Sequence, residues 1–115
     1  MGFSLVTLTT KGARSGLQRT TQINGFADGE NAWLVVASNA GADTNPAWFV
    51  NIVKNPDEIW LKIGRRNLKV RSELLTGAAR LTALRRVAAI SPQYGDYQKQ
   101  TDREIPIIRL TPDQG

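Results

Sequence analysis

The stretch from Asp57 to Leu75, DEIWLKIGRRNLKVRSELL, contains two short segments in which apolar and polar residues alternate. The apolar residues fall at every second position, on one face of each segment: Ile59, Leu61 and Ile63, then Leu68 and Val70. Alternation of this kind predicts half-buried strands, and the sequence GRRN between them predicts a hairpin. We therefore expect antiparallel β-structure at this point of the chain.

Three further strands are predicted before this hairpin and one after it. The earlier ones are the β-branched segment 3–10, the alternating segment 19–26 and the apolar run 32–38, which we expect to be buried on both faces. The sequence DGE at 28–30 predicts a turn between the last two. The later strand is expected at 105–110, where Pro106 indicates the edge of a sheet.

Two helices are predicted. The first has Asn45 as its N-cap, Pro46 at its first position and Lys54 in its last turn. Its apolar stripe should face the sheet, and the stripe consists of Trp48, Phe49, Ile52 and Val53. The second starts at Thr76 and is closed by Pro92, and we expect it to turn inward Leu81, Leu84 and Ala88 and to turn outward Arg80, Arg85 and Arg86. The segment 94–104 is expected to be a polar connector.

The order of these elements predicts a mainly β (α+β) fold with about six mostly antiparallel strands. Most consecutive strands are linked by tight turns, so we expect a closed or half-closed barrel with two or three helices packed on it. Strands and helices do not alternate regularly, which argues against a dinucleotide-binding doubly wound sheet. The length of 115 residues suits a single domain, 1–115.

The composition excludes several kinds of chemistry. The chain has no Cys and no His, so disulfides, thiolate nucleophiles, zinc fingers and Ser-His-Asp triads are excluded. Its ten acidic residues are scattered without the spacing of a calcium loop, and we expect no metal site. An enzyme of this composition would take its chemistry from an organic cofactor. The sequence shows neither a signal peptide nor an apolar run of membrane-spanning length, which makes the cytoplasm the expected location.

The positive charge predicts an anionic partner: a nucleic acid, a membrane surface contacted peripherally, or a phosphorylated or carboxylated small molecule. Fifteen Lys and Arg face ten acids, giving +5, and ten of the cations are Arg. Three of the fifteen cations, Lys11, Arg14 and Arg19, lie with Ser15 and two glycines in the segment TTKGARSGLQR. Their charges and the hydroxyl of Ser15 suit phosphate or carboxylate oxygens. A solvated basic turn is the alternative interpretation of this segment.

Two other segments are candidate sites. The loop SNAGADTN, from Ser38 to Asn45, ends at a predicted helix N-terminus, where free N–H groups favour an anion, although helix capping alone would explain its last residues. Tyr94 and Tyr97 lie three residues apart and would point the same way on a helix. They could line a pocket and donate a proton, or simply pack in the core.

Three blocks of the sequence together resemble one known family. They are LTTKGARSGLQRTTQINGF at 8–26, VVASNAGADTNPAWFVNIVKNP at 35–56 and YGDYQKQTDREIPIIRLTP at 94–112. In this order and spacing they are similar to the deazaflavin-dependent nitroreductases and quinone reductases, which use coenzyme F420. The resemblance implies a flavin-reductase-like split β-barrel that binds the anionic 5-deazaflavin coenzyme. It also implies transfer of the coenzyme's hydride to a quinone, a nitroaromatic or another activated acceptor.

The resemblance also implies roles for individual residues. It places the coenzyme's phosphate and tail on Arg14, Ser15 and Arg19, and the body of the coenzyme along Thr21 and Asn24. It places the deazaflavin ring between two sets of residues: Val36, Ala37, Ser38 and Asn39 on one side and Ala47, Trp48 and Asn51 on the other. Tyr94 and Tyr97 would shape the acceptor pocket and are the candidate proton donors.

Some positions depart from the family pattern. Many relatives carry Arg where this chain has Ala13, and some carry Lys where it has Asn39, so we expect weaker coenzyme binding. Ser91 replaces a Tyr found in some nitroreductases, which weakens the case for activation of nitroimidazole prodrugs. Two alternatives stay open on the same barrel: an FMN-binding reductase, and a non-catalytic carrier of lipid or other small molecules. A nucleic-acid partner is not expected, because the aromatic residues lie within apolar runs rather than among cations.

Overall fold

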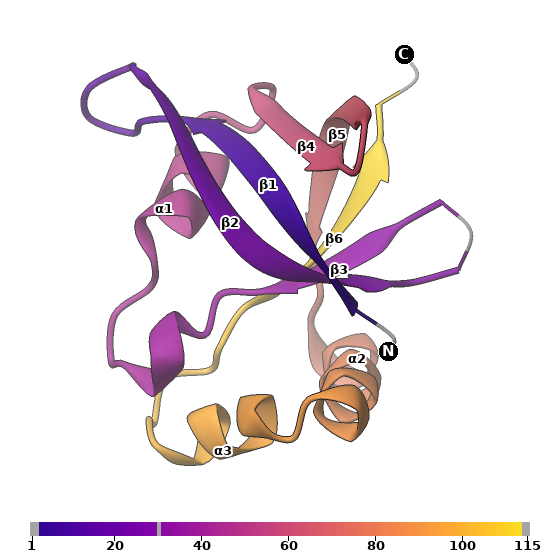
Figure 1. Cartoon of the computed structure of the whole chain (residues 1–115). Coiled ribbons are helices and arrows are strands. Elements are labelled where there is room, and N and C mark those ends of the chain that lie inside the picture. Colours follow the sequence, from indigo (N-terminus) through magenta and orange to yellow (C-terminus); the bar gives the residue numbers. More distant parts are fainter. Residues whose placement is uncertain (1–2, 30, 114–115) are drawn as a thin grey trace.

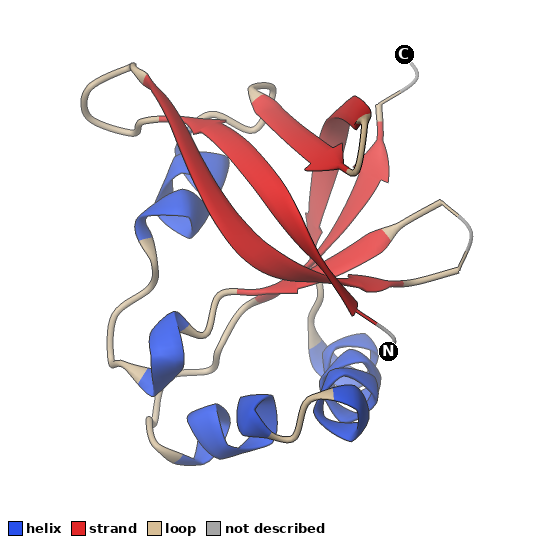
Figure 2. Cartoon of the chain, viewed as in Figure 1, coloured by secondary structure: helices blue, strands red, loops and turns tan. Residues whose placement is uncertain are grey.

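The computed structural model describes residues 3–29 and 31–113, which form a closed six-stranded barrel (Figures 1 and 2). The helices Gly77–Ile90 and Gln93–Lys99 lie together at one end of it, and the helix Ala47–Lys54 lies apart from them. The strands are β1 Phe3–Lys11, β2 Gln18–Ala27, β3 Trp33–Val36, β4 Ile59–Ile63, β5 Arg66–Leu74 and β6 Ile107–Pro112. They close in the order β1-β2-β3-β6-β5-β4, and every neighbouring pair is antiparallel. This confirms the expected mainly β fold. Among the described residues, no helix has the length and apolarity needed to cross a membrane.

The predicted hairpin is confirmed, because β4 and β5 pair with Ile63 opposite Arg66 across a two-residue turn. The apolar positions of its strands face the interior of the barrel, where they meet residues of β1 and β6. This first core contains Val6, Leu8, Ile59, Leu61, Val70, Ile108 and Leu110. Alternation along each strand therefore places one apolar set inside the barrel and leaves the polar set on its outer surface.

A second core lies between the barrel and the helices. Phe26, Leu34 and Ile107 project from the strands and pack against Val87 and Tyr94. Strand β3 contributes to both cores, with Leu34 in this one and Val35 in the first, so its predicted burial on both faces is confirmed. The helical elements are the 3-10 turn η1 Asn39–Gly41, α1 Ala47–Lys54, α2 Gly77–Ile90 and α3 Gln93–Lys99.

The predicted edge at Pro106 is wrong. A closed barrel has no edge, and β6 begins one residue later, at Ile107. The carbonyl oxygen of Pro106 accepts a hydrogen bond from the N–H of Ala37, 2.9 Å away. Proline is tolerated here because it lies just before the strand, where the ladder requires no donor from it.

Helix α1 begins one residue later than predicted. Its N-cap is Pro46, with an extended backbone, and the side chain of Asn45 does not cap the helix but accepts a hydrogen bond from Arg103. The predicted stripe is also wrong at Val53, which is 65% exposed, whereas Asn51 is buried. The amide of Asn51 can be buried because both of its polar atoms find partners, as described below.

The inward face of α2 is rotated from the predicted one. Its buried residues are Arg80, Ala83 and Val87, while Leu81 is 48% exposed. The guanidinium of Arg80 tolerates burial because Nε and Nη2 both donate to the carbonyl oxygen of Ile105, at 3.1 and 2.9 Å. The segment 94–104, predicted to be a polar connector, is helical as far as Lys99, with Tyr94 buried against Phe26.

Candidate functional site

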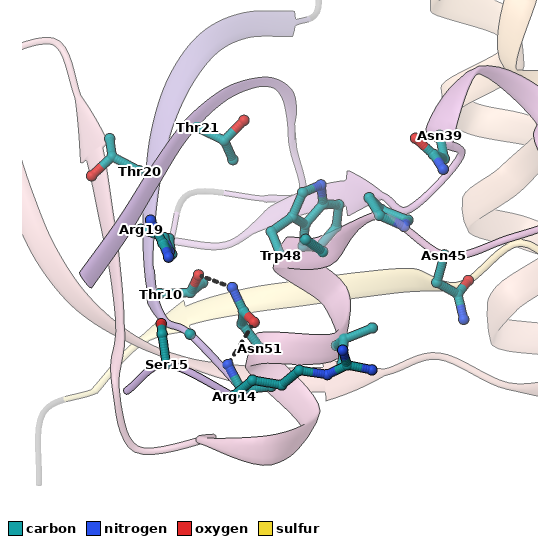
Figure 3. Close-up of a pocket in the computed structure, with 15 residues that line it drawn as sticks. Thr10, Arg14, Ser15, Arg19, Thr20, Thr21, Asn39, Asn45, Trp48 and Asn51 are labelled. Atoms are coloured by element: carbon teal, nitrogen blue, oxygen red, sulfur yellow. Dashed lines mark hydrogen bonds between the residues drawn. The ribbon is translucent and has the colours of Figure 1, made fainter. Parts of the chain in front are cut away.

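A groove of about 670 Å³ runs between the β1–β2 hairpin, α1 and the loop that precedes α1 (Figure 3). It brings together residues that lie far apart in the sequence. Those predicted as coenzyme contacts are Arg14, Ser15, Arg19, Thr21, Asn39, Ala47, Trp48 and Asn51. The lining also includes Thr10, Gly12 and Ala13 of the predicted basic segment and Asn45 of the predicted loop, and the residues that sequence reasoning missed are Thr20, Pro46 and Val50. The basic segment and the loop around Asn39, which were separate candidates, are thus two walls of one site.

Strand pairing places the β2 residues in this groove. Arg19 lies opposite Thr10 and Thr21 lies opposite Leu8, and residues directly opposite one another share a face of the sheet. Because Leu8 and Thr10 are buried on the inner side of the sheet, Arg19 and Thr21 project toward that side as well. Figure 3 shows the indole of Trp48 between Thr21 and Asn39.

The basic segment is held in place by Asn51 of α1. Its Oδ1 accepts from the N–H of Ala13 at 2.9 Å, and its Nδ2 donates to Thr10 Oγ1 at 3.1 Å (Figure 3). The turn also depends on Gly12, since a Cβ there would lie 2.5 Å from Ser15 Oγ. Asn51 therefore fixes the loop that presents Arg14 and Ser15, and both ends of its amide are already engaged.

The opposite wall contains strained backbone. Asn39, Ala40 and Gly41 are consecutive residues with positive φ, at 47°, 54° and 81°. A non-glycine residue pays roughly 1–2 kcal/mol for this left-handed conformation, less for Asn than for Ala. The turn is closed by the N–H of Gly41, which donates to Ser38 O at 2.9 Å, and by Asn39 Nδ2, which donates to Thr44 O at 3.1 Å. Strain of this kind persists only where surrounding contacts impose it.

Arg103 supplies those contacts from the segment between α3 and β6. Its guanidinium makes five hydrogen bonds to the wall, donating to Ala37 O at 3.1 Å, Ser38 O at 2.9 Å, Ala42 O at 2.9 and 3.2 Å, and Asn45 Oδ1 at 2.6 Å. Beside it, Thr101 Oγ1 donates to Asp43 Oδ1 at 2.7 Å. The sequence contains no pattern that pairs 103 with 37–45, so this interaction was missed.

The other predicted coenzyme contacts on this wall do not line the groove. Ala37 is fully buried, and its carbonyl oxygen and N–H are occupied by Arg103 and Pro106. Ser38 is also buried, and Val36 packs in the second core. These three residues support the groove wall from behind.

The two tyrosines form a separate polar and aromatic group with Asn24. The position of Asn24, three residues after Thr21, turns its side chain to the other face of β2, where Nδ2 donates to the hydroxyl oxygen of Tyr94 at 3.1 Å. The rings of Tyr94 and Tyr97 meet edge to face, with centroids 5.7 Å apart. None of these three residues is among those that line the groove.

The groove is electrostatically one-sided. Among its described lining residues, Arg14 and Arg19 are charged and neither Asp nor Glu is present. Elsewhere, Asp28 forms ion pairs with Arg86 of α2 and Arg109 of β6, and none of these three residues lines the groove. Within residues 3–29 and 31–113, no group of three or more acidic side chains is arranged to hold a metal ion.

These features suit an organic ligand with a planar ring and an anionic tail. A volume of about 670 Å³ lies within the roughly 300–1,000 Å³ typical of cofactor and small-molecule sites. Two guanidiniums and the hydroxyl of Ser15 can bind phosphate or carboxylate oxygens, while Trp48, Pro46 and Ala47 offer an apolar surface to a ring.

Comparison with known proteins gives consistent matches. The family model for F420H(2)-dependent quinone reductases matches residues 1–112. An F420H(2)-dependent quinone reductase of Mycobacterium tuberculosis is 32% identical over 108 residues, which covers 90% of this chain and 70% of the relative. The solved structure of an F420-H2 dependent reductase, FDR-A, matches with a TM-score of 0.81 and 29% identity over 92% of each chain.

More distant structures share the fold alone. A Listeria innocua protein assigned to the pyridoxamine 5′-phosphate oxidases matches with a TM-score of 0.64 at 14% identity, covering 96% of this chain and 84% of its own. Together with the reductase structure, this match confirms the expected split barrel.

Proposed function

The chain belongs to the F420H(2)-dependent quinone reductase family, and we propose that it holds coenzyme F420 in the groove beside α1. The chain is an oxidoreductase that uses this coenzyme and reduces a quinone. When bound, the coenzyme supplies the hydride, so the protein's own part is to bind, to orient and to exclude water.

The observation that carries the proposal is the polarity of the groove along its length. Ser15 and Arg19 lie at the end formed by the basic segment, Arg14 extends its side chain from that segment past Asn51, and Trp48 lies toward the loop at Asn39 (Figure 3). A guanidinium binds phosphate and carboxylate oxygens in a forked geometry, and an indole offers an apolar face to a ring. A coenzyme with a phosphorylated, carboxylate-rich tail and a tricyclic ring has the matching polarity.

The proposed roles follow from these positions. Arg14, Ser15 and Arg19 hold the phosphate and tail, while Thr21, Asn39, Ala47 and Trp48 border the ring. Asn51 contributes by fixing the basic segment, and Val36, Ala37 and Ser38 by supporting the wall.

The tyrosines are proposed to serve the acceptor. Asn24 donates to the oxygen of Tyr94, so the hydroxyl proton of Tyr94 is left to be donated elsewhere. The hydroxyl of Tyr97 makes no hydrogen bond with the described residues and is half-buried. Either phenol can therefore donate a proton to a reduced acceptor.

We also propose a second class of acceptor and a location. The second class is the nitroaromatic compounds, and the location is the cytoplasm. The family assignment favours the deazaflavin over FMN or a carried lipid.

The test is a titration of the purified protein with coenzyme F420, followed by absorbance, with FMN in a parallel titration. We expect saturable binding of the deazaflavin, and about a 10- to 100-fold higher Kd for Arg14→Ala and for Arg19→Ala, because each loses a charge-assisted hydrogen bond. Arg85→Ala is the matched control, since it removes an exposed guanidinium from α2. Tighter binding of FMN, or no binding by a folded protein at micromolar concentration, would overturn the proposal.

A further inference from the structure

The outer surface of the barrel carries a feature that the groove does not use. On β4, Trp60 lies directly between Thr9 of β1 and Lys69 of β5, and Lys62 lies between Thr7 and Asn67. These residues point away from the interior, because their neighbours Leu61 and Leu68 point into it. Strands β1, β4 and β5 thus present one continuous outward surface.

This surface is cationic. Lys11, Lys62, Lys69 and Arg71 are all exposed on it, and with Trp60 we call them the cationic barrel face. In the part of the chain that the structure describes, none of these four cations forms an ion pair. The β4–β5 turn adds Arg65 and Arg66, so the six cations outnumber the four neighbouring acids, which are Asp57, Glu58, Glu73 and Asp113.

An aromatic side chain lies within this charge. Trp60 is 38% exposed and borders a hollow of about 530 Å³, whose charged lining residues are Lys11 and Glu58 and which Gln18 and Asn67 also line. On the same side of β1, Leu5 is 61% exposed. Tryptophan among lysines is the combination found where proteins meet the bilayer interface, because the ring is amphipathic and the cations attract anionic headgroups.

We propose that the cationic barrel face docks on an anionic lipid bilayer. The positive charge of the face is complementary to anionic headgroups. A nucleic acid is a poorer fit, because proteins that bind single strands without sequence preference stack successive bases on several aromatic side chains, and this face has only Trp60. The hollow and the coenzyme groove share Thr10, so docking holds the groove close to the lipid. Apolar quinones dissolve in that lipid; this last link rests on the proposed function, whereas the docking does not.

The experiment is co-sedimentation of the coenzyme-free protein with two kinds of vesicle. One is pure phosphatidylcholine, and the other contains about one part phosphatidylglycerol to three parts phosphatidylcholine. We expect binding to the second alone, lost near ~1 M salt, where the Debye length falls to about 3 Å. Each cation close to the membrane surface raises the partition coefficient about fivefold. The double variant Lys62→Gln with Lys69→Gln should therefore lower that coefficient about 25-fold.

A matched variant separates the face from net charge. Arg85→Gln with Lys99→Gln removes the same charge from exposed helix positions and should partition like the parent protein. Trp60→Phe should greatly reduce a blue shift of tryptophan emission on vesicle addition, since Trp48 is buried and Trp33 packs against the first core. Coenzyme-dependent reduction of a water-soluble quinone should continue in the Lys62 and Lys69 variant, which shows that it is folded.

Three results would overturn the proposal. They are no binding to anionic vesicles, an equal loss of vesicle binding in the two double variants, or tighter binding to a single-stranded oligonucleotide than to the vesicles. A failure of coenzyme binding would leave the vesicle result intact, so failure of the docking and failure of the proposed function are distinguishable.

Discussion

The guanidinium of Arg103 lies 2.6 Å, from Nη1 to Oδ1, from the side chain of Asn45, which begins the connection into α1. The same guanidinium binds carbonyl oxygens on both sides of the left-handed turn at Asn39 and Ala40. A residue outside the groove therefore fixes the backbone of one groove wall.

Replacing Arg103 with Lys should weaken coenzyme binding. An ammonium cannot reproduce a planar fork of five hydrogen bonds, so the wall should relax and the Kd for coenzyme F420 should rise about tenfold. The control is Arg109→Lys, which disturbs the ion pair with Asp28 away from the groove. If both variants lost thermal stability and neither changed the Kd, Arg103 would have a purely structural role.

Asn51→Ala should destabilise the protein by about 1–3 kcal/mol, because it leaves the buried hydroxyl of Thr10 and the N–H of Ala13 without their partner. Urea unfolding measures this. The basic segment should also become easier to cleave by trypsin at Arg14, whereas Asn55→Ala, which removes an exposed bond to Lys11 O, should have little effect. Equal cleavage in both variants would contradict the anchoring role.

The two tyrosines should respond differently to removal of their hydroxyls. Tyr94→Phe leaves Nδ2 of Asn24 unpaired and should cost about 1 kcal/mol of stability. Tyr97→Phe removes no hydrogen bond among the described residues, so its stability should be unchanged. If Tyr97 donates the proton, the Tyr97→Phe variant should turn over a quinone about 10²-fold more slowly or worse, with an unchanged Kd for the coenzyme. Unchanged turnover in both variants would assign the proton to solvent.

Asp28 should make stability depend on acid pH. Burial alone would raise the pKa of this carboxyl, but hydrogen bonds and charges from Arg109 and Arg86 outweigh it and hold the pKa below the ordinary 3.8. The stabilisation is therefore present above the ordinary pKa and is lost as pH falls through the lowered one. Asp28→Asn should lose about 1–2 kcal/mol at neutral pH, with the difference shrinking in acid, as measured by urea unfolding. A constant difference at all pH values would contradict this.

The strands and the basic segment were predictable from the sequence because their causes are local. Alternation every second residue determined which side of β4 and β5 is apolar, and GRRN determined their hairpin. The residues of the first wall, Arg14, Ser15 and Arg19, were identifiable for the same reason: glycine and cation chemistry in a short segment.

The helices were less predictable, because burial depends on partners that are distant in sequence. Arg80 faces inward and Leu81 outward, since the carbonyl oxygen of Ile105 satisfies the guanidinium. Asn51 displaced Val53 from the buried stripe because Thr10 and Ala13 pair with its amide. At these positions a polar residue is buried and an apolar one is exposed, because the polar group finds a hydrogen-bond partner. The periodicity of apolar residues in the sequence does not reveal this.

The β-rich barrel, the lack of Cys and His chemistry and the family assignment could all be inferred from the amino-acid sequence alone. Three features appear only in the folded molecule: the basic segment and the loop at Asn39 form one groove, Asn24 and the tyrosines form a group outside its lining, and Arg103 holds the wall. Strand and turn preferences act over a few residues, whereas these arrangements arise from hydrogen bonds between segments some sixty residues apart, such as Arg103 with Ala37 at a separation of 66.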